Sequence, residues 1–212
     1  MVRGFVLLTL GRGRTRLLYS RLFGPKGPPV ELPVPASSRE AELGAPVSDQ
    51  ASHGLQRDRL RAKEQLMAVA RQVSSSCILA RQVADKPLPD SGAALGEESI
   101  GFQEPDLGVF RLPAGDIFAE ETTVVWIGVH LLGFALICDT YENLMLAENT
   151  LRLLVRYFKE HLRLFNHSND IVLKTDRIEA ILNTFLPHGQ LMFLNCCFIQ
   201  SLEKELNASM LK

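Results

Sequence analysis

The most apolar stretch of the chain is TVVWIGVHLLGFALIC, residues 123–138. It is shorter than the roughly 20 apolar residues that a membrane-spanning helix needs, and it contains a histidine and two glycines. β-Branched residues gather at its start, and the glycines bracket its midpoint. The pattern therefore predicts two antiparallel strands, 122–129 and 133–139, joined by a tight turn near His130 and Leu131. Because both strands are apolar on both faces, we expect central strands with helices covering each side of the sheet.

The residues before this stretch predict two further strands, a helix and a third strand. Two apolar runs, 2–10 and 16–23, flank a GRGRT break and indicate a first β-hairpin. Residues 55–84 place apolar side chains at helical spacings between charged ones, which predicts an amphipathic helix, either continuous or broken near the serines 74–76. We expect its arginine-rich face to be solvated rather than bound to acidic lipid or to a partner. The run GVFRL, 108–112, predicts a short strand.

Helices dominate the carboxyl-terminal part of the chain. Residues 144–165 carry leucine and phenylalanine at spacings of three to five, which predicts a long amphipathic helix. A short extended piece, 170–174, follows, and Thr175 is expected to cap a helix that ends at Pro187-His188-Gly189. A last helix is predicted over 195–207. The predicted order is therefore strand, strand, helix, three strands and then helices.

Two segments lack the pattern of any helix or strand. Residues 24–54 hold six of the chain's 11 prolines and no aromatic residue, so this segment cannot bury enough surface to order itself. Residues 85–106 are similarly rich in proline, glycine and acidic residues. We expect one domain over residues 1–212 with flexible insertions at 24–54 and 85–106. A proline-rich ligand for an SH3-type groove is the alternative for the first insertion.

Composition and charge exclude several classes of protein. The chain is 46% hydrophobic and 22% charged, which is typical of a folded globular protein. The 23 basic residues are balanced by 24 acidic ones, so no net positive field is available to hold nucleic acid. The start, MVRGFVLLTL, is followed at once by GRGR where a signal peptide needs small uncharged residues. We therefore expect a cytosolic protein.

No sequence motif predicts catalytic, metal or cofactor chemistry. The chain lacks the phosphate-binding, nucleophile-elbow and zinc-protease motifs, and its histidines have no second ligand at metal spacing. His130 is expected to be a turn residue with its ring in solvent. The cysteines, which lack a C-x-x-C pair, are expected to be reduced and mostly buried thiols. They are Cys77, Cys138, Cys196 and Cys197. The last two lie beside Phe198 in an apolar context that makes them poor nucleophiles.

Three blocks of sequence resemble the sigma subunits of heterotetrameric vesicle-coat adaptors. GRTRLLYS, beginning at Gly13, resembles the G-K-T-R-L turn between the first two strands of that family. Residues 124–144 resemble its central hairpin and the polar turn that follows, and residues 170–189 resemble a segment that begins D-I-x-F-N-F. Together with the predicted order of elements, the resemblance implies an α+β fold. The expected fold is a longin-like, five-stranded antiparallel-type sheet flanked by helices on both faces.

The departures from the common sigma pattern resemble one divergent branch of the family. Lys174-Thr175 replaces N-F, Leu186-Pro187-His188-Gly189 replaces the double-glycine ending, and the two insertions are long. Arg57-Asp58-Arg59-Leu60, the helix from Lys63 and the run LPHGQLMFLN from Leu186 resemble the sigma chain of the fifth adaptor complex. The resemblance implies a non-catalytic subunit that assembles with two large chains and one medium chain. It also implies endosomal transport on the cytosolic face of late endosomes and lysosomes, without clathrin.

The resemblance also implies four candidate residues for binding cargo. In related sigma chains an acidic dileucine signal places its leucines in an apolar pocket at the central hairpin and the following helix. Matching block by block, the basic position falls on Arg16, the hairpin positions on Val129 and Leu131, and the helix position on Leu154. The alternative is that the three apolar residues belong to the core and that Arg16 is a solvated strand end.

Two other classes of function remain as alternatives at this point. One is a different longin-type module, such as a vesicle-fusion or GTPase-regulator domain. The other is an enzyme or redox protein built on Cys196 and Cys197. The absence of any catalytic motif disfavours the second.

Overall fold

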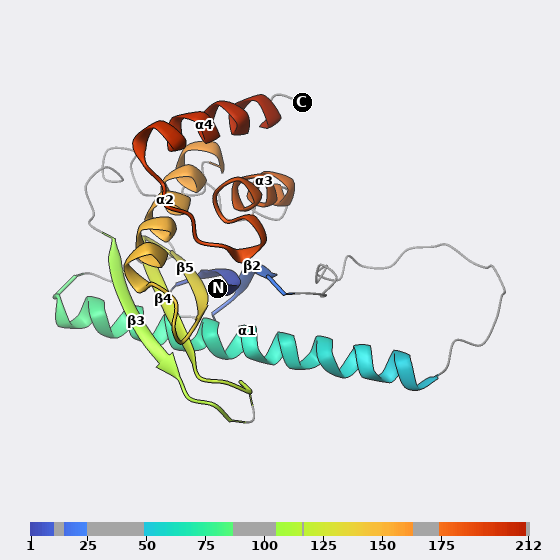
Figure 1. Cartoon of the computed structure of the whole chain (residues 1–212). Helices are drawn as coiled ribbons and strands as arrows, with labels where there is room; N and C mark the ends of the chain where they lie inside the picture. Colours follow the sequence, from blue (N-terminus) through green and yellow to red (C-terminus); the bar gives the residue numbers. More distant parts are fainter. Residues whose placement is uncertain (11–14, 25–48, 87–104, 116, 163–173, 211–212) are drawn as a thin grey trace.

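A computed structural model of the chain describes residues 1–10, 15–24, 49–86, 105–115, 117–162 and 174–210, with the side chains of 49–55, 209 and 210 left aside. The elements in chain order are β1 (Val2–Thr9), β2 (Leu17–Leu22), α1 (Asp49–Val83), β3 (Asp106–Leu112), β4 (Thr122–Val129), β5 (Leu132–Asp139), α2 (Leu144–Leu162), α3 (Thr175–Phe185), the 3₁₀ turn η3 (Pro187–Gly189) and α4 (Cys196–Met210) (Figure 1). This order confirms the predicted sequence of strands and helices.

The strands form a single antiparallel sheet in the order β2-β1-β5-β4-β3. The apolar run is the β4–β5 hairpin, in which Gly128 pairs with Gly133 and Val129 pairs with Leu132 around the predicted two-residue turn. β5 lies at the centre of the sheet because β1 pairs with its other edge. Among the described residues, no helix has the length and apolar character required to cross a bilayer.

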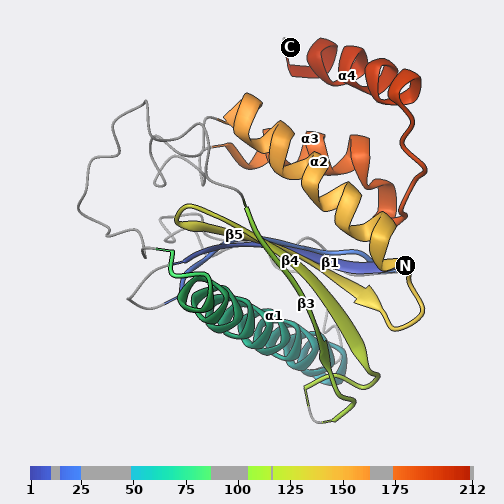
Figure 2. The same ribbon diagram turned by 90° about the vertical axis from the view of Figure 1, so that its left-hand side faces the viewer.

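Both faces of the sheet are covered, which confirms the longin-like α+β class. α1 packs on one face and α2 with α3 on the other, as Figure 2 shows. Side chains of β1 alternate between the two layers: Val6 and Leu8 are buried with α1, whereas Phe5 and Leu7 are buried with α2 and α3. Each strand of the sheet centre therefore contributes to two separate apolar cores.

The first helix is longer than predicted. α1 begins at Asp49 and runs without a break to Val83, so the expected loop is wrong for residues 49–54 and the break at the serines is absent. Ser74 is 5% exposed between the buried residues Val73 and Cys77, so this part of the helix lies against the sheet. Tertiary packing therefore holds a helical turn that local propensity alone disfavours.

Other boundaries differ more modestly. The strand expected at 108–112 begins at Asp106, and the last helix continues to Met210. The cap predicted at Thr175 is wrong: the cap position is Lys174, without a side-chain cap hydrogen bond, and Thr175 is already helical. The rest of the first insertion (25–48), most of the second (87–104), the first hairpin turn (11–14) and the predicted piece at 170–173 lie outside the described residues.

The turn after α3 is unusually tight. His188 and Gly189 have φ of 50° and 77°, and a side chain at Gly189 would overlap the carbonyl oxygen of Val2 and the ring of Phe23. Only glycine combines this left-handed conformation with such a close approach of backbone. The turn redirects the chain past the start of β1 towards α4, and the segment 191–195 that follows contributes to the surface described below.

Candidate functional site

Three of the four predicted cargo residues lie at one end of the sheet. Arg16, exposed just before β2, accepts a backbone hydrogen bond from Thr9 at 2.9 Å, and its own amide donates to the Thr9 hydroxyl at 3.0 Å. The amide of Leu10 donates to the carbonyl oxygen of Leu131 at 2.6 Å. The end of β1 therefore lies between Arg16 and the turn that carries Leu131, with the half-buried Val129 preceding that turn.

The fourth predicted residue is buried in the core. Leu154 is 0% exposed in the cluster that α2 forms with the sheet, and Val129 packs against the same cluster. Leu154 therefore packs in the core beneath the hairpin and is not itself on the surface. The cargo pocket stays a prediction, with Arg16 exposed and with Val129 and Leu131 half-buried.

The same end of the sheet is clamped to α1 by a buried ion pair. Arg81 Nε donates to Asp106 Oδ2 at 2.6 Å, and Lys86 Nζ lies 3.0 Å from the other carboxylate oxygen. Arg81 also donates through Nη2 to the carbonyl oxygen of His130 at 2.7 Å. His130 is only 9% exposed, so the prediction of a ring in solvent is wrong. The end of α1 covers this turn, which the local sequence does not reveal.

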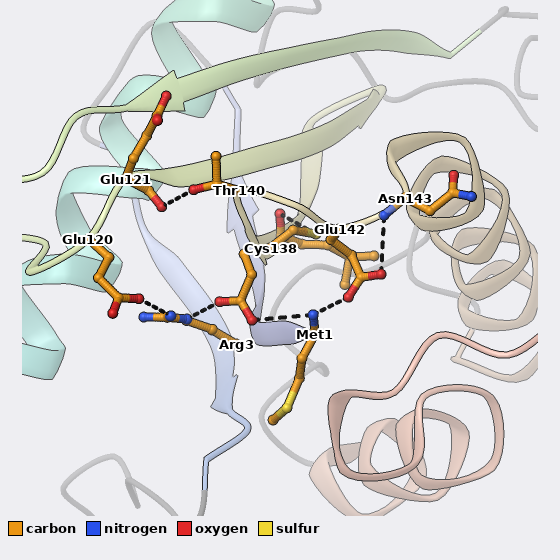
Figure 3. Close-up of polar contacts among 10 residues, drawn as sticks. Met1, Arg3, Glu120, Glu121, Cys138, Thr140, Glu142 and Asn143 are labelled. Carbon is orange, nitrogen blue, oxygen red and sulfur yellow. Dashed lines mark hydrogen bonds and ion pairs between the residues drawn. The ribbon is translucent and has the colours of Figure 1, made fainter.

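A second polar network fixes the opposite end of the sheet (Figure 3). The amino group of Met1 pairs with Glu142 and, at 3.3 Å, with Asp139. Arg3 donates to Asp139 and to Glu120. Burial alone would lower the pKa of the Met1 amine, but the bonds from Glu142 and Asp139 raise it overall. These contacts join β1, the end of β5 and the turn before α2, and so hold the first turn of α2 in place.

The thiols show no catalytic arrangement. All four cysteines are free, and the described residues contain no group of histidine, cysteine and acidic side chains that could hold a metal ion. Burial raises the pKa of Cys77 to about 11 and that of Cys138 to about 12, so both are inert at neutral pH. Cys196 and Cys197 are exposed, which corrects the prediction that they lie in apolar surroundings.

An apolar groove of about 350 Å³ lies between the first half of α2 and the chain that leads into α4. One wall is a helical stripe of α2 that includes Leu146, Thr150 and Leu153, and the other includes Phe193 and Ile199. In Figures 1 and 2 the segment entering α4 runs beside this part of α2. None of the described residues that line the groove is charged. The sequence prediction missed this site, although the apolar run LMFL at 191–194 is an unusual sequence for an exposed connection.

Large apolar side chains extend the groove onto the surrounding surface. Met145 is 68% exposed at the start of α2, Phe193 is 84% exposed, and Phe198 is 40% exposed in the first turn of α4. Polar contacts hold both walls: Asn143 Oδ1 accepts from the amide of Leu146 at 3.1 Å, and Asn195 Oδ1 accepts from that of Phe198 at 2.8 Å. The exposed apolar surface is therefore built on two capped helix ends.

A buried tyrosine fixes α4 against α2. The hydroxyl of Tyr157 donates to Glu203, and Arg156 lies 3.3 Å from the same carboxylate. The Tyr157 ring stacks on Phe185 at 4.3 Å between centroids. Burial, followed by the bond to Glu203, raises the pKa of Tyr157 to about 12, so it stays a hydrogen-bond donor at neutral pH. The Tyr157–Glu203 contact therefore fixes the position of α4, whose first turns form one side of the groove.

The five-stranded antiparallel sheet with helices on both faces defines the class: a longin-like α+β domain, consistent with a small chain of the adaptor type. The family model of AP-5 complex subunit sigma-1 matches residues 1–207. AP-5 complex subunit sigma-1 of Homo sapiens is 45% identical over 215 aligned positions, covering 99% of this chain and 98% of that protein. The Mus musculus protein of that name is 43% identical over 170 positions, covering 77% and 89%. The chain belongs to the AP-5 complex subunit sigma-1 family.

Proposed function

We propose that this chain is the non-catalytic sigma subunit of an AP-5-type adaptor complex and stabilises the core of that complex. Its partners would be two large chains and one medium chain. The observation that carries the proposal is the match to the sigma-1 family over nearly the whole chain. The exposed apolar surface around Met145 and Phe193 supports it, because a monomer rarely leaves such side chains uncovered beside an apolar groove.

The proposal includes a place and a process. The complex would act in endosomal vesicle-mediated transport, on the cytosolic face of late endosomes and lysosomes, and this chain would reach the membrane only through its partners. The near balance of 23 basic and 24 acidic residues supports that last point, because no large positive surplus is available to hold an anionic bilayer.

The test is affinity purification of the endogenous, tagged chain followed by quantitative mass spectrometry. Three adaptor subunits should co-purify in amounts equal to the bait. The control is a Phe158→Asp variant, which places a charge in the core beneath α2, where Phe158 is 0% exposed, and should lose all three. Recovery of a GTPase or a fusion protein in place of adaptor subunits would favour a different longin-type function.

Localisation is tested separately by fluorescence microscopy of the same tagged chain. We expect overlap with late-endosomal and lysosomal markers and dispersal into the cytosol when a large adaptor chain is depleted. A chain that remains on membranes after depletion would contradict recruitment through the complex.

A further inference from the structure

The amino-terminal part of α1 extends beyond the sheet. α1 is 35 residues long, but its buried apolar side chains begin only at Leu66. Just before it, the Gln65 amide donates to the carbonyl oxygen of Ile117, in the connection between β3 and β4, at 2.6 Å. Residues 56–64 are exposed, apart from the half-buried Ala62, and Figure 1 shows this part of the helix running past the strands. About two and a half turns of α1 therefore project from the domain.

The side of α1 that packs on the sheet continues into the projecting part as a basic stripe. The buried members of this side follow one another at spacings of three and four residues and are Leu66, Ala70, Val73 and Cys77. Such spacings keep side chains on one face of a helix. Continued towards the amino terminus, they reach Lys63 and then Arg59, both of which are exposed. The same face is apolar where it meets the sheet and basic where the sheet has ended.

The two cations have no carboxylate to neutralise them on their own helix. Neither Arg59 nor Lys63 forms an ion pair or hydrogen bond with another described residue. They are four residues apart, a spacing at which like charges repel each other. The acidic residues of this stretch, Asp58 and Glu64, each lie three residues from Arg61, and neither is three or four residues from Arg59 or Lys63. Carboxylates from outside α1 would relieve this repulsion.

The position of the stripe restricts what can reach it. The stripe lies on the side of α1 that faces the sheet, so it borders the space beside the end of the sheet. A flat bilayer brought against this side of the helix would meet the sheet first. A polypeptide segment, about 10 Å across even when helical, is narrow enough to lie beside the end of the sheet. The geometry therefore favours a protein partner over a membrane surface.

We propose that an acidic segment of a neighbouring subunit lies under the projecting part of α1 and pairs its carboxylates with Arg59 and Lys63. Leu60, which is 56% exposed, and the half-buried Met67 lie three and four residues from Lys63 and offer apolar contact beside the charges. The charge pairs would chiefly select the partner and its register. This inference rests on the proposed function, which supplies the neighbouring subunit.

Charge reversal in the complete complex tests the pairing. The double variant Arg59→Glu and Lys63→Glu should dissociate from the complex about three- to thirtyfold faster than the wild type at about 0.15 M NaCl. The difference should shrink at about 0.5 M NaCl, because salt screens exposed charge pairs. Arg57→Glu with Arg71→Glu is the matched control, since it makes the same change of charge at exposed positions on the outward face of α1. This control should dissociate as the wild type does.

The two double variants decide between a specific stripe and general charge. Equal dissociation rates for the Arg59 and Lys63 variant and the wild type would overturn the inference. A loss of the same size at both salt concentrations would also overturn it, because a structural defect is not screened. Equal acceleration in the matched control would show that net charge, and not this stripe, holds the complex.

Zero-length cross-linking identifies the partner. A carbodiimide joins a lysine amine directly to a carboxylate in contact with it, so in the purified complex Lys63 should be joined to an aspartate or glutamate of another subunit. Lys63→Arg keeps the charge and should leave assembly unchanged while abolishing this cross-link. A cross-link from Lys63 to a carboxylate of this same chain, or none in an intact complex, would overturn the inference.

Vesicle flotation tests the membrane as the other source of negative charge. The complex should float equally well with phosphatidylserine vesicles whether it carries the wild-type chain or the Arg59 and Lys63 double variant. Loss of flotation in the variant alone would assign the stripe to a bilayer and overturn the proposal. A wild-type chain that recovers no adaptor subunits overturns the proposed function itself, whereas an intact complex without the Lys63 cross-link overturns only this inference.

Discussion

At the scale of single residues, burial separates four cysteines that look alike in the sequence. Cys77 and Cys138 face the two cores, and burial raises the pKa of both thiols well above neutrality. Cys196 and Cys197 begin α4 and are exposed. Their apolar neighbour Phe198 is itself 40% exposed, so apolar sequence context did not imply a buried environment here.

A brief pulse of iodoacetamide on the folded chain at pH 8 should therefore label two thiols rapidly and two slowly. Cys196 and Cys197 react first because they are exposed, while Cys77 and Cys138 react only after unfolding. Peptide mass spectrometry checks the result, with a denatured sample as the control. Rapid labelling of Cys77 in the folded protein would contradict the packing of α1 on the sheet.

The predicted cargo residues also need a test at this scale. Arg16→Glu should weaken binding of an acidic dileucine peptide to the assembled complex about two- to tenfold, because it replaces an attractive charge with a repulsive one at an exposed position. Arg71→Glu, exposed on α1, is the matched control and should bind as the wild type does. Fluorescence anisotropy of the labelled peptide measures both.

The leucine positions must be probed with care. Leu154→Ser would damage the core, since Leu154 is 0% exposed, so lost binding would not show that the residue touches cargo. Leu131 is partly exposed in the turn and is the better choice for substitution. Equal binding by wild type and Arg16→Glu, or no binding by the wild type, would indicate that this subunit does not bind the cargo signal and serves only to stabilise the complex.

At the scale of elements, a buried ion pair anchors α1 at its carboxyl-terminal end. The Arg81 and Asp106 side chains are 6% and 8% exposed, and together they join α1, β3 and the β4–β5 turn. Elsewhere α1 packs through a row of apolar side chains between Leu66 and Cys77, and the Gln65 amide donates to the carbonyl oxygen of Ile117 at 2.6 Å. The ion pair therefore fixes the position of the helix along the sheet.

Arg81→Met should destabilise the chain by about 2–4 kcal/mol, because it leaves Asp106 buried with only Lys86 as a charged partner. Arg152→Met is the control: Arg152 pairs with Glu148 on the surface of α2, where the loss should stay below about 1 kcal/mol. Urea denaturation of both variants in the assembled complex gives the comparison. Equal losses of unfolding free energy in the two variants would show that the buried ion pair stabilises the chain no more than the surface pair does.

At the scale of the whole molecule, the apolar surface indicates a subunit that is incomplete alone. Tyr141, Met145 and Phe193 are each more than two-thirds exposed, at 100%, 68% and 84%, and the last two border the groove. The remaining apolar residues of α2 are largely used by the core, including Leu151, Leu154 and Phe158. Exposed large apolar side chains therefore lie on the outer side of α2 and on the approach to α4, and α1 carries further ones near its carboxyl-terminal end.

Expression of the chain without partners should give aggregation or rapid loss, because an interface of this kind is unstable when exposed to water. Co-expression with the other adaptor subunits should raise the soluble yield several-fold, which immunoblotting of soluble fractions measures. A Phe193→Ser and Met145→Ser double variant should improve the solubility of the lone chain. A wild-type monomer that melts at a high temperature, unchanged by its partners, would contradict the prediction that the chain is unstable alone.

Much of the fold could be predicted because its strongest signals are local. The β4–β5 hairpin is confirmed within one residue at each end, since two strands that are apolar on both faces and separated by a turn have few alternatives. The longin-like class followed from the order of elements together with family motifs. The prediction for the His130 ring failed because local sequence does not report that the end of α1 covers the turn. The cap predicted at Thr175 is wrong by one residue, since Lys174 holds the cap position.

The sequence by itself determined the strands, the helices and the family, because alternation and helical spacing of apolar residues act over short distances. Only the tertiary structure decided which apolar residues remain exposed to solvent. It buries Leu154 and exposes Phe193, although both are large and apolar, because Leu154 lies on the side of α2 that packs on the sheet whereas Phe193 lies in the connection between η3 and α4. Burial depends on contacts between residues far apart in sequence, so a groove forms only when those segments come together.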